Sequence, residues 1–65
     1  MSLGSLVKAR RVELGMSQGE LAKMSGYTSR STICKIEHGE RDVPTRQLKL
    51  IAAALKMEAA DLVKD

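Results

Sequence analysis

The segment from Met16 to Gly39 constrains the fold more than any other part of the chain. Ser17 and Glu20 have the spacing of a capping box, in which the serine hydroxyl and the glutamate carboxylate each accept from the other residue's amide. Gly26 and Gly39 stand where helices end, because glycine adopts the left-handed conformation of a helix end without steric cost. The segment therefore predicts two short helices separated by a tight turn.

The residues between these signals agree with two helices. Thr28 or Ser29 can cap the second helix, because both carry a hydroxyl just before it begins. The apolar residues that we assign to the buried faces are Leu21, Ala22, Met24, Ile33 and Ile36. Two helices of about two turns with small polar residues and a glycine between them are typical of a helix-turn-helix. In such a motif the second helix, here 30–37, enters a DNA groove.

Apolar residues also recur at helical spacing on both sides of this segment. Leu3, Val7 and Leu14 predict a helix over 3–14. An apolar stripe from Leu48 to Leu55 predicts a helix over 45–55, and a short last helix follows over 58–63. With the helices over 18–25 and 30–37, the sequence predicts an all-α fold: a single domain, residues 1–65, in which five short helices form a compact bundle.

The composition narrows the classes of function. A chain of 65 residues with one cysteine, one histidine and a formal charge of +3 is one small domain. Cys34 and His38 cannot form a disulfide or a metal-binding set between them, so we expect a reducing compartment, no metal and no cofactor. The chain lacks the roughly 18 consecutive apolar residues of a membrane span and a signal peptide's hydrophobic segment. A cytoplasmic protein without membrane contact is expected.

Arg11 is unusual because it shares a helix face with apolar residues, where a buried charge must be paired. Glu37, at the end of the second helix of the motif, is the partner expected from its sign. The alternative is that the stem of Arg11 lies on the core while its guanidinium reaches water.

The whole chain resembles the Cro/CI-type (Xre-like) helix-turn-helix domains of phage and bacterial repressors. The resemblance covers about Leu3 to Leu62. It is carried by Arg11, Met16-Ser-Gln-x-Glu-Leu-Ala, Gly26, Ser31-Thr-Ile-Cys-Lys-Ile-Glu-His-Gly39, Pro44 and Leu48-x-x-Ile-Ala-x-x-Leu55. It implies a lambda-repressor-like DNA-binding domain, which acts as a transcriptional regulator, usually a repressor. It also implies a buried ion pair between Arg11 and Glu37.

The resemblance further implies which residues touch DNA, with the first residues of the reading helix against the base edges. By position, the candidates for reading bases are Arg30, Ser31, Lys35, Ser29 and Thr28. Arginine can donate two hydrogen bonds to guanine, a pair worth about 1–3 kcal/mol of discrimination. The candidates for binding phosphates are Gln18, Thr32, Lys8, Arg10, Arg41, Thr45 and Arg46.

The chain departs from the family pattern at three places. Between Gly26 and Ile33 it has one residue more than many members, so either the turn or the entry of the reading helix is lengthened, and the roles of Ser29 and Arg30 can exchange by one position. Lys56 stands where a helix-ending glycine is common, and Glu58 replaces the usual serine or threonine cap. The last helix often contributes to dimers in this family, so these departures bear on the homodimer that we expect.

Two other classes of function compete with a DNA-binding regulator. An antitoxin or adaptor could bind a protein partner through apolar residues and bind DNA only secondarily. The residues predicted for a dimer or partner contact are Leu50, Met57, Ala59, Leu62 and Val63. An enzyme is not expected, because the sequence shows neither a pair of nucleophile and general base nor a set of metal ligands. Phage repressor, restriction–modification controller and antitoxin are all settings compatible with the sequence.

Overall fold

The computed structural model describes residues 2–62, and within them the chain forms five helices. They are α1 (Leu3–Glu13), α2 (Gln18–Met24), α3 (Arg30–Glu37), α4 (Thr45–Ala54) and α5 (Ala59–Leu62). The first four helices begin where the sequence predicted and end at or one residue before the predicted position. The last helix begins one residue later than predicted, at Ala59, and its predicted last residue, Val63, lies outside the described residues.

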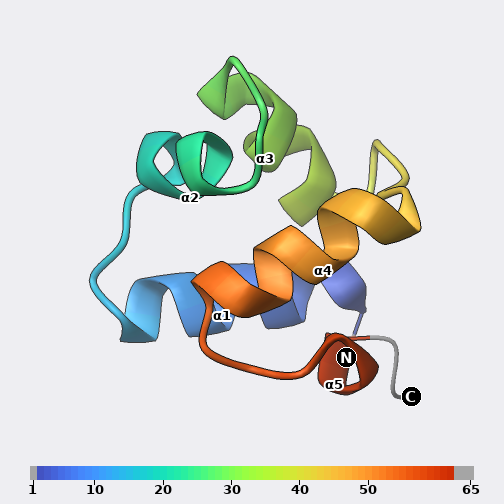
Figure 1. Cartoon of the computed structure of the whole chain (residues 1–65). Coiled ribbons are helices and arrows are strands. Elements are labelled where there is room, and N and C mark those ends of the chain that lie inside the picture. The colour runs from blue at the N-terminus through green and yellow to red at the C-terminus, as the bar shows by residue number, and fades with distance from the viewer. Residues whose placement is uncertain (1, 63–65) are drawn as a thin grey trace.

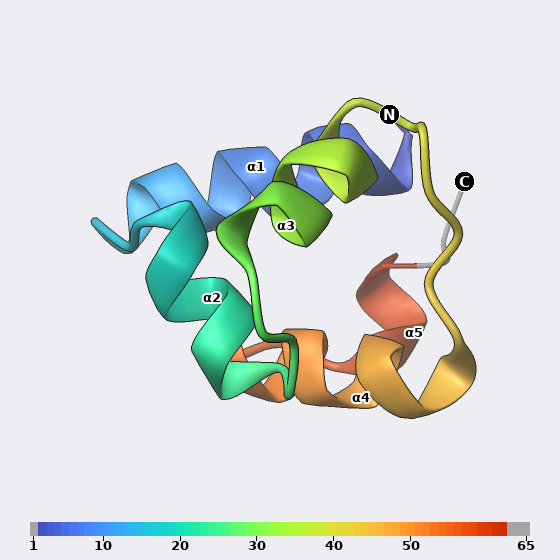
Figure 2. The ribbon, with the colours of Figure 1, turned by 90° about the horizontal axis from the view of Figure 1, so that it is seen from above.

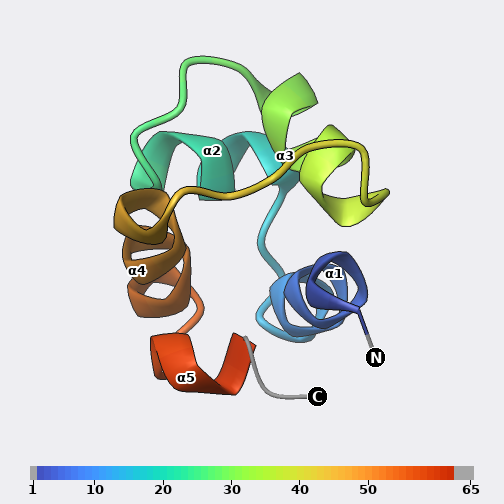
Figure 3. The ribbon, with the colours of Figure 1, turned by 90° about the vertical axis from the view of Figure 1, so that its right-hand side faces the viewer.

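The five helices pack into one bundle, with α2 and α3 side by side at one end and α1, α4 and α5 below them (Figure 1). Contacts join α2 to α3, α1 to α3, α2 to α4, and α5 to both α1 and α4. Seen from above, α1 and α4 lie on opposite sides of the molecule; α2 runs from the side of α1 to the side of α4, and α3 lies beside α1 (Figure 2). The view from the side shows α5 beneath α1 and α4, at the end opposite α2 and α3 (Figure 3).

One core fills the space between the helices. Its fully buried large side chains are Val7, Leu21, Ile33, Ile36, Ile51, Leu55 and Leu62, so every helix contributes at least one. The prediction for Met24 was wrong, because its side chain is 54% exposed. Ser25, four residues after Leu21, takes the inner position and donates its hydroxyl to the Leu21 carbonyl at 2.7 Å. This bond satisfies the buried hydroxyl and leaves Met24 on the outside.

Each of the first four helices ends at a residue with left-handed backbone. After α2 this residue is Gly26, with φ 79°, and the Tyr27 amide donates to the Ala22 carbonyl at 2.9 Å. Gly15 and Gly39 end α1 and α3 in the same way. Lys56 does so after α4, although it is not glycine. The sequence marked Gly26 and Gly39 as helix ends, and the family resemblance marked the position of Lys56.

The start of α1 lies unusually close to the end of α3. A Cβ atom on Gly4 would stand 2.5 Å from the carbonyl oxygens of Ile36 and Glu37. Only glycine allows the two backbones to approach this closely. This approach and the core contacts of α1 hold the end of α3 in a fixed position.

Candidate nucleic-acid interface

The reading helix α3 begins at Arg30 because Ser29 caps it. Ser29 has extended backbone, and its hydroxyl accepts from the Ser31 amide at 3.2 Å. Of the two cap candidates, Ser29 therefore holds this position, and Thr28 lies before it in the turn. Arg30 is the first residue of the helix.

The two sides of α3 differ in chemistry. Ile33 and Ile36 are buried against the core, whereas Arg30, Ser31 and Lys35 are exposed. Thr32 and Cys34 are half-buried at the boundary between the two sides. A short helix with cationic and hydroxyl side chains at its outer, N-terminal part can donate hydrogen bonds to base edges and phosphates.

An open hollow of about 310 Å³ lies between α2 and α3, lined by Gln18, Arg30, Ser31 and Cys34. Gly19 lies beside it, since a Cβ atom there would stand 4.0 Å from the Cβ of Arg30. The structure thus brings the predicted phosphate contact Gln18 next to two predicted base contacts, although these residues come from different helices.

The ion pair predicted between Arg11 and Glu37 is present. The Arg11 Nε donates to Glu37 Oε2 at 2.6 Å and Nη2 donates to Oε1 at 3.2 Å. The Arg11 Nη1 also donates to the Met16 carbonyl at 2.8 Å, so the pair joins α1, α3 and the loop before α2. Gln18 completes the group, because its Nε2 donates to Glu37 Oε1 at 3.0 Å.

The capping box predicted at the start of α2 is formed. The Glu20 amide donates to the Ser17 hydroxyl at 3.0 Å, and the Ser17 amide donates to the Glu20 carboxylate at 2.9 Å. The backbone N–H of Ser17, and then its hydroxyl, hold the pKa of Glu20 below its ordinary value of 4.5. This cap fixes the position of Gln18, the first residue of α2.

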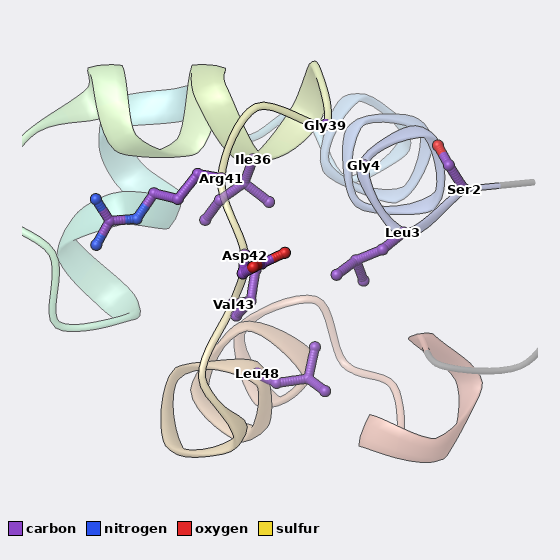
Figure 4. A pocket seen from close by; sticks show the side chains of 9 residues that line it. All are labelled: Ser2, Leu3, Gly4, Ile36, Gly39, Arg41, Asp42, Val43 and Leu48. Atoms are coloured by element: carbon purple, nitrogen blue, oxygen red, sulfur yellow. The ribbon is translucent and has the colours of Figure 1, made fainter.

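Two predicted phosphate contacts make other interactions. The Arg10 Nε donates to the Leu55 carbonyl at 2.9 Å and its Nη1 bonds Glu13, so its guanidinium ties α1 to the end of α4. Figure 4 shows the Arg41 side chain extending away from a pocket of about 450 Å³ at the start of α1 and the end of α3. Its guanidinium lies over the Tyr27 ring, 5.5 Å from the centroid, a cation–π distance.

The remaining candidates for phosphate binding are accessible to different degrees. Three of them are exposed, namely Lys8, Thr45 and Arg46, and two are half-buried, namely Thr32 and Gln18.

A sequence profile of the helix-turn-helix family, of the Xre/Cro/CI type, matches residues 7–62. The chain belongs to this family. The match includes α2, α3 and the turn between them.

Solved structures of helix-turn-helix proteins share the whole fold. The P22 c2 repressor in complex with synthetic operator 9T is 30% identical, with a TM-score of 0.92, and 98% of this chain and 96% of that chain are covered. The restriction–modification controller C.AhdI from Aeromonas hydrophila is 33% identical, with a TM-score of 0.85. The match covers 92% of this chain and 89% of that chain. SinR, from a complex with SinI, is 28% identical, with a TM-score of 0.84. The match covers 97% of this chain and 61% of that chain.

In this helix-turn-helix protein, one of the predicted dimer contacts is wrong. Leu62 is 2% exposed, because α5 packs against α1 and α4 and directs this side chain into the core. Met57 and Ala59 are half-buried, Leu50 is 41% exposed, and Val63 lies outside the described residues. Leu50 therefore offers the largest apolar surface among the four candidates that the structure describes.

Sequence reasoning missed three contacts of this helix-turn-helix domain. They are the bond from Gln18 to Glu37, the bond from Arg10 to Leu55 and the stacking of Arg41 on Tyr27. Each joins residues far apart in the chain, so no local pattern in the sequence indicates it.

The described part of the chain contains few other chemical features. Between residues 2 and 62, no three His, Cys, Asp or Glu side chains are grouped to hold a metal ion. The His38 Nδ1 lies 2.7 Å from the carbonyl oxygen of Cys34, within the last turn of α3. None of the described helices has the length and apolar character that crossing a membrane requires.

Proposed function

We propose that this protein binds an operator in double-stranded DNA and regulates transcription, as a repressor, with α3 in the major groove. The observation that carries the proposal is the outer face of α3, where Arg30, Ser31 and Lys35 are exposed at the end that phage repressors place against base edges. Family membership and the likeness to an operator-bound repressor support it.

Within this proposal the side chains divide by role. Arg30 reads a guanine through two donors, and Ser31 and Lys35 contact neighbouring bases, with Ser29 and Thr28 beside them. Phosphates on either side are bound by residues that the structure leaves accessible: Gln18, Thr32, Lys8, Arg41, Thr45 and Arg46. These contacts position the domain, whereas α3 supplies the sequence preference.

We further propose that the protein acts as a homodimer, since two copies would read two half-sites about one helical turn apart. The contact would include Leu50, which is exposed, and the half-buried Met57 and Ala59. A protein partner at the same surface is the competing proposal, and the SinR–SinI complex is the structural neighbour that motivates it.

The test is enrichment of duplex DNA from a random pool at about 0.15 M salt, where binding through phosphates alone is weak and unselective. We expect wild-type protein to enrich an inverted repeat and Arg30→Ala to lose preference at one position of each half-site. Lys49→Ala is the matched control, because it removes one exposed positive charge from α4 and should enrich the same sequence. Binding without any enriched sequence would contradict the proposal and favour a protein partner.

A further inference from the structure

Glu37 is the most buried charged side chain of the interface, with 1% of its side chain exposed. Its two carboxylate oxygens accept three hydrogen bonds, two from Arg11 and one from the Gln18 amide. The bonds to Arg11 neutralise the carboxylate, so that a negative charge can lie near a DNA backbone without repelling it. The bond to Gln18 is not needed to neutralise the carboxylate.

The carboxylate of Glu37 fixes which end of the Gln18 amide faces it. An ionised carboxylate only accepts hydrogen bonds, so the amide nitrogen and not the oxygen must face Glu37. The second N–H and the carbonyl oxygen of Gln18 are then left for the hollow that Gln18 shares with Arg30, Ser31 and Cys34. A phosphate oxygen is also only an acceptor, so the second N–H is the group that can bind it.

We propose that Glu37 is a positioning residue for DNA binding, which acts by holding the Gln18 amide with one N–H directed toward a phosphate. This inference rests on the proposed function. Arg11 has the supporting role, because it holds Glu37 in place through two hydrogen bonds. A glutamine side chain fixed before binding loses no rotamer freedom when the phosphate arrives, and so contributes more to affinity than a mobile one.

The test is a double-mutant cycle on operator affinity. The variant that removes the anchor is Arg11→Met with Glu37→Leu, which replaces a buried ion pair by apolar side chains, keeps the net charge and is compatible with a stable fold. We expect this variant and Gln18→Ala each to weaken operator binding about five- to tenfold, the worth of one hydrogen bond. Adding Gln18→Ala to the anchor variant should change the affinity less than about twofold.

A purely structural role for Glu37 gives a different result. If the ion pair only stabilises the fold, Gln18→Ala weakens binding by the same factor in both backgrounds, and this additivity would overturn the inference. The NMR signals of the Gln18 side-chain amide give a test that needs no variant. We expect the proton bonded to Glu37 to be shifted downfield and the amide to be immobile in the DNA-free protein; an amide averaged as in solvent would also overturn it.

The two proposals can fail separately. A wild-type protein that enriches no sequence contradicts the proposed function, and this inference with it. A wild-type protein that enriches an operator, together with additive effects of the variants, contradicts only the role of Glu37. Circular dichroism and thermal unfolding of each variant establish that the affinities refer to folded protein.

Discussion

Lys56 ends α4 with φ 58°, in the left-handed region that side chains with a Cβ adopt at a cost. The turn is otherwise well formed, because the Met57 amide donates to the Ala52 carbonyl at 2.9 Å. The sequence marked this position, since the family commonly has glycine there. The structure shows that lysine occupies the same backbone conformation and does not redirect the chain.

Replacing Lys56 by glycine should therefore stabilise the protein. We expect Lys56→Gly to raise the free energy of unfolding by about 0.5–1 kcal/mol, since relief of the left-handed strain exceeds the extra entropy of glycine in the unfolded chain. Urea unfolding measures this change. Lys56→Ala is the control, because it removes the same charge but keeps the Cβ; equal stabilisation by both variants would contradict the explanation.

At the scale of single helices, local signals in the sequence were sufficient to predict where α1, α2 and α3 begin or end. The start of α2 follows from the capping box of Ser17 and Glu20, and the ends of α1, α2 and α3 follow from glycines. These signals act within about six residues, so a single sequence contains them completely. The ion pair of Arg11 and Glu37 was the one long-range contact that was predicted: the apolar face around Arg11 raised it as one of two alternatives, and the family resemblance implied it.

The capping box makes the stability of α2 depend on pH. Because the folded state holds the pKa of Glu20 below 4.5, its contribution is complete above that value and is lost as the pH falls through the lower, folded pKa. We expect wild-type protein to melt at a higher temperature than Glu20→Gln at about pH 7, and this difference to shrink at about pH 3. A difference that stays constant over this range would show that the carboxylate charge has no part in the cap.

Contacts between distant helices could not be predicted in the same way. Arg10 was assigned to a phosphate, yet it bonds the carbonyl of Leu55, 45 residues later in the chain. Leu62 was assigned to a dimer surface, yet it fills the core. Both contacts went unpredicted for one reason: the direction in which α5 and the end of α4 pack against α1 is set by the whole bundle and leaves no local pattern in the sequence.

At the scale of the whole molecule, Gly4 marks a close approach of two elements, where α1 meets the end of α3. Gly4→Ala should destabilise the protein by about 1–3 kcal/mol, because the new methyl group meets backbone carbonyl oxygens at 2.5 Å and forces the helices apart. Thermal or urea unfolding measures the loss.

Gly19 provides the matched control, since it is also a helical glycine. Its nearest neighbours to an added Cβ, Ser17 Oγ and Arg30 Cβ, lie at 3.9 and 4.0 Å. We expect Gly19→Ala to leave stability unchanged or raise it by up to about 1 kcal/mol, the usual effect of alanine in a helix. The same effect of alanine at both positions would show that α1 and α3 are not in close contact at Gly4.

The left-handed turns between the helices also bear on how quickly the chain reaches this structure. Two of these turns place a helix directly against its successor, α2 against α3 and α4 against α5. Folding barriers are low when most contacts are between neighbours in sequence, and helical domains of this kind fold in microseconds to milliseconds. The contacts that join helices distant in sequence are those of α1 with α3 and α5 and of α2 with α4. We therefore expect the two neighbouring pairs to form first and the docking of α1 to complete the fold.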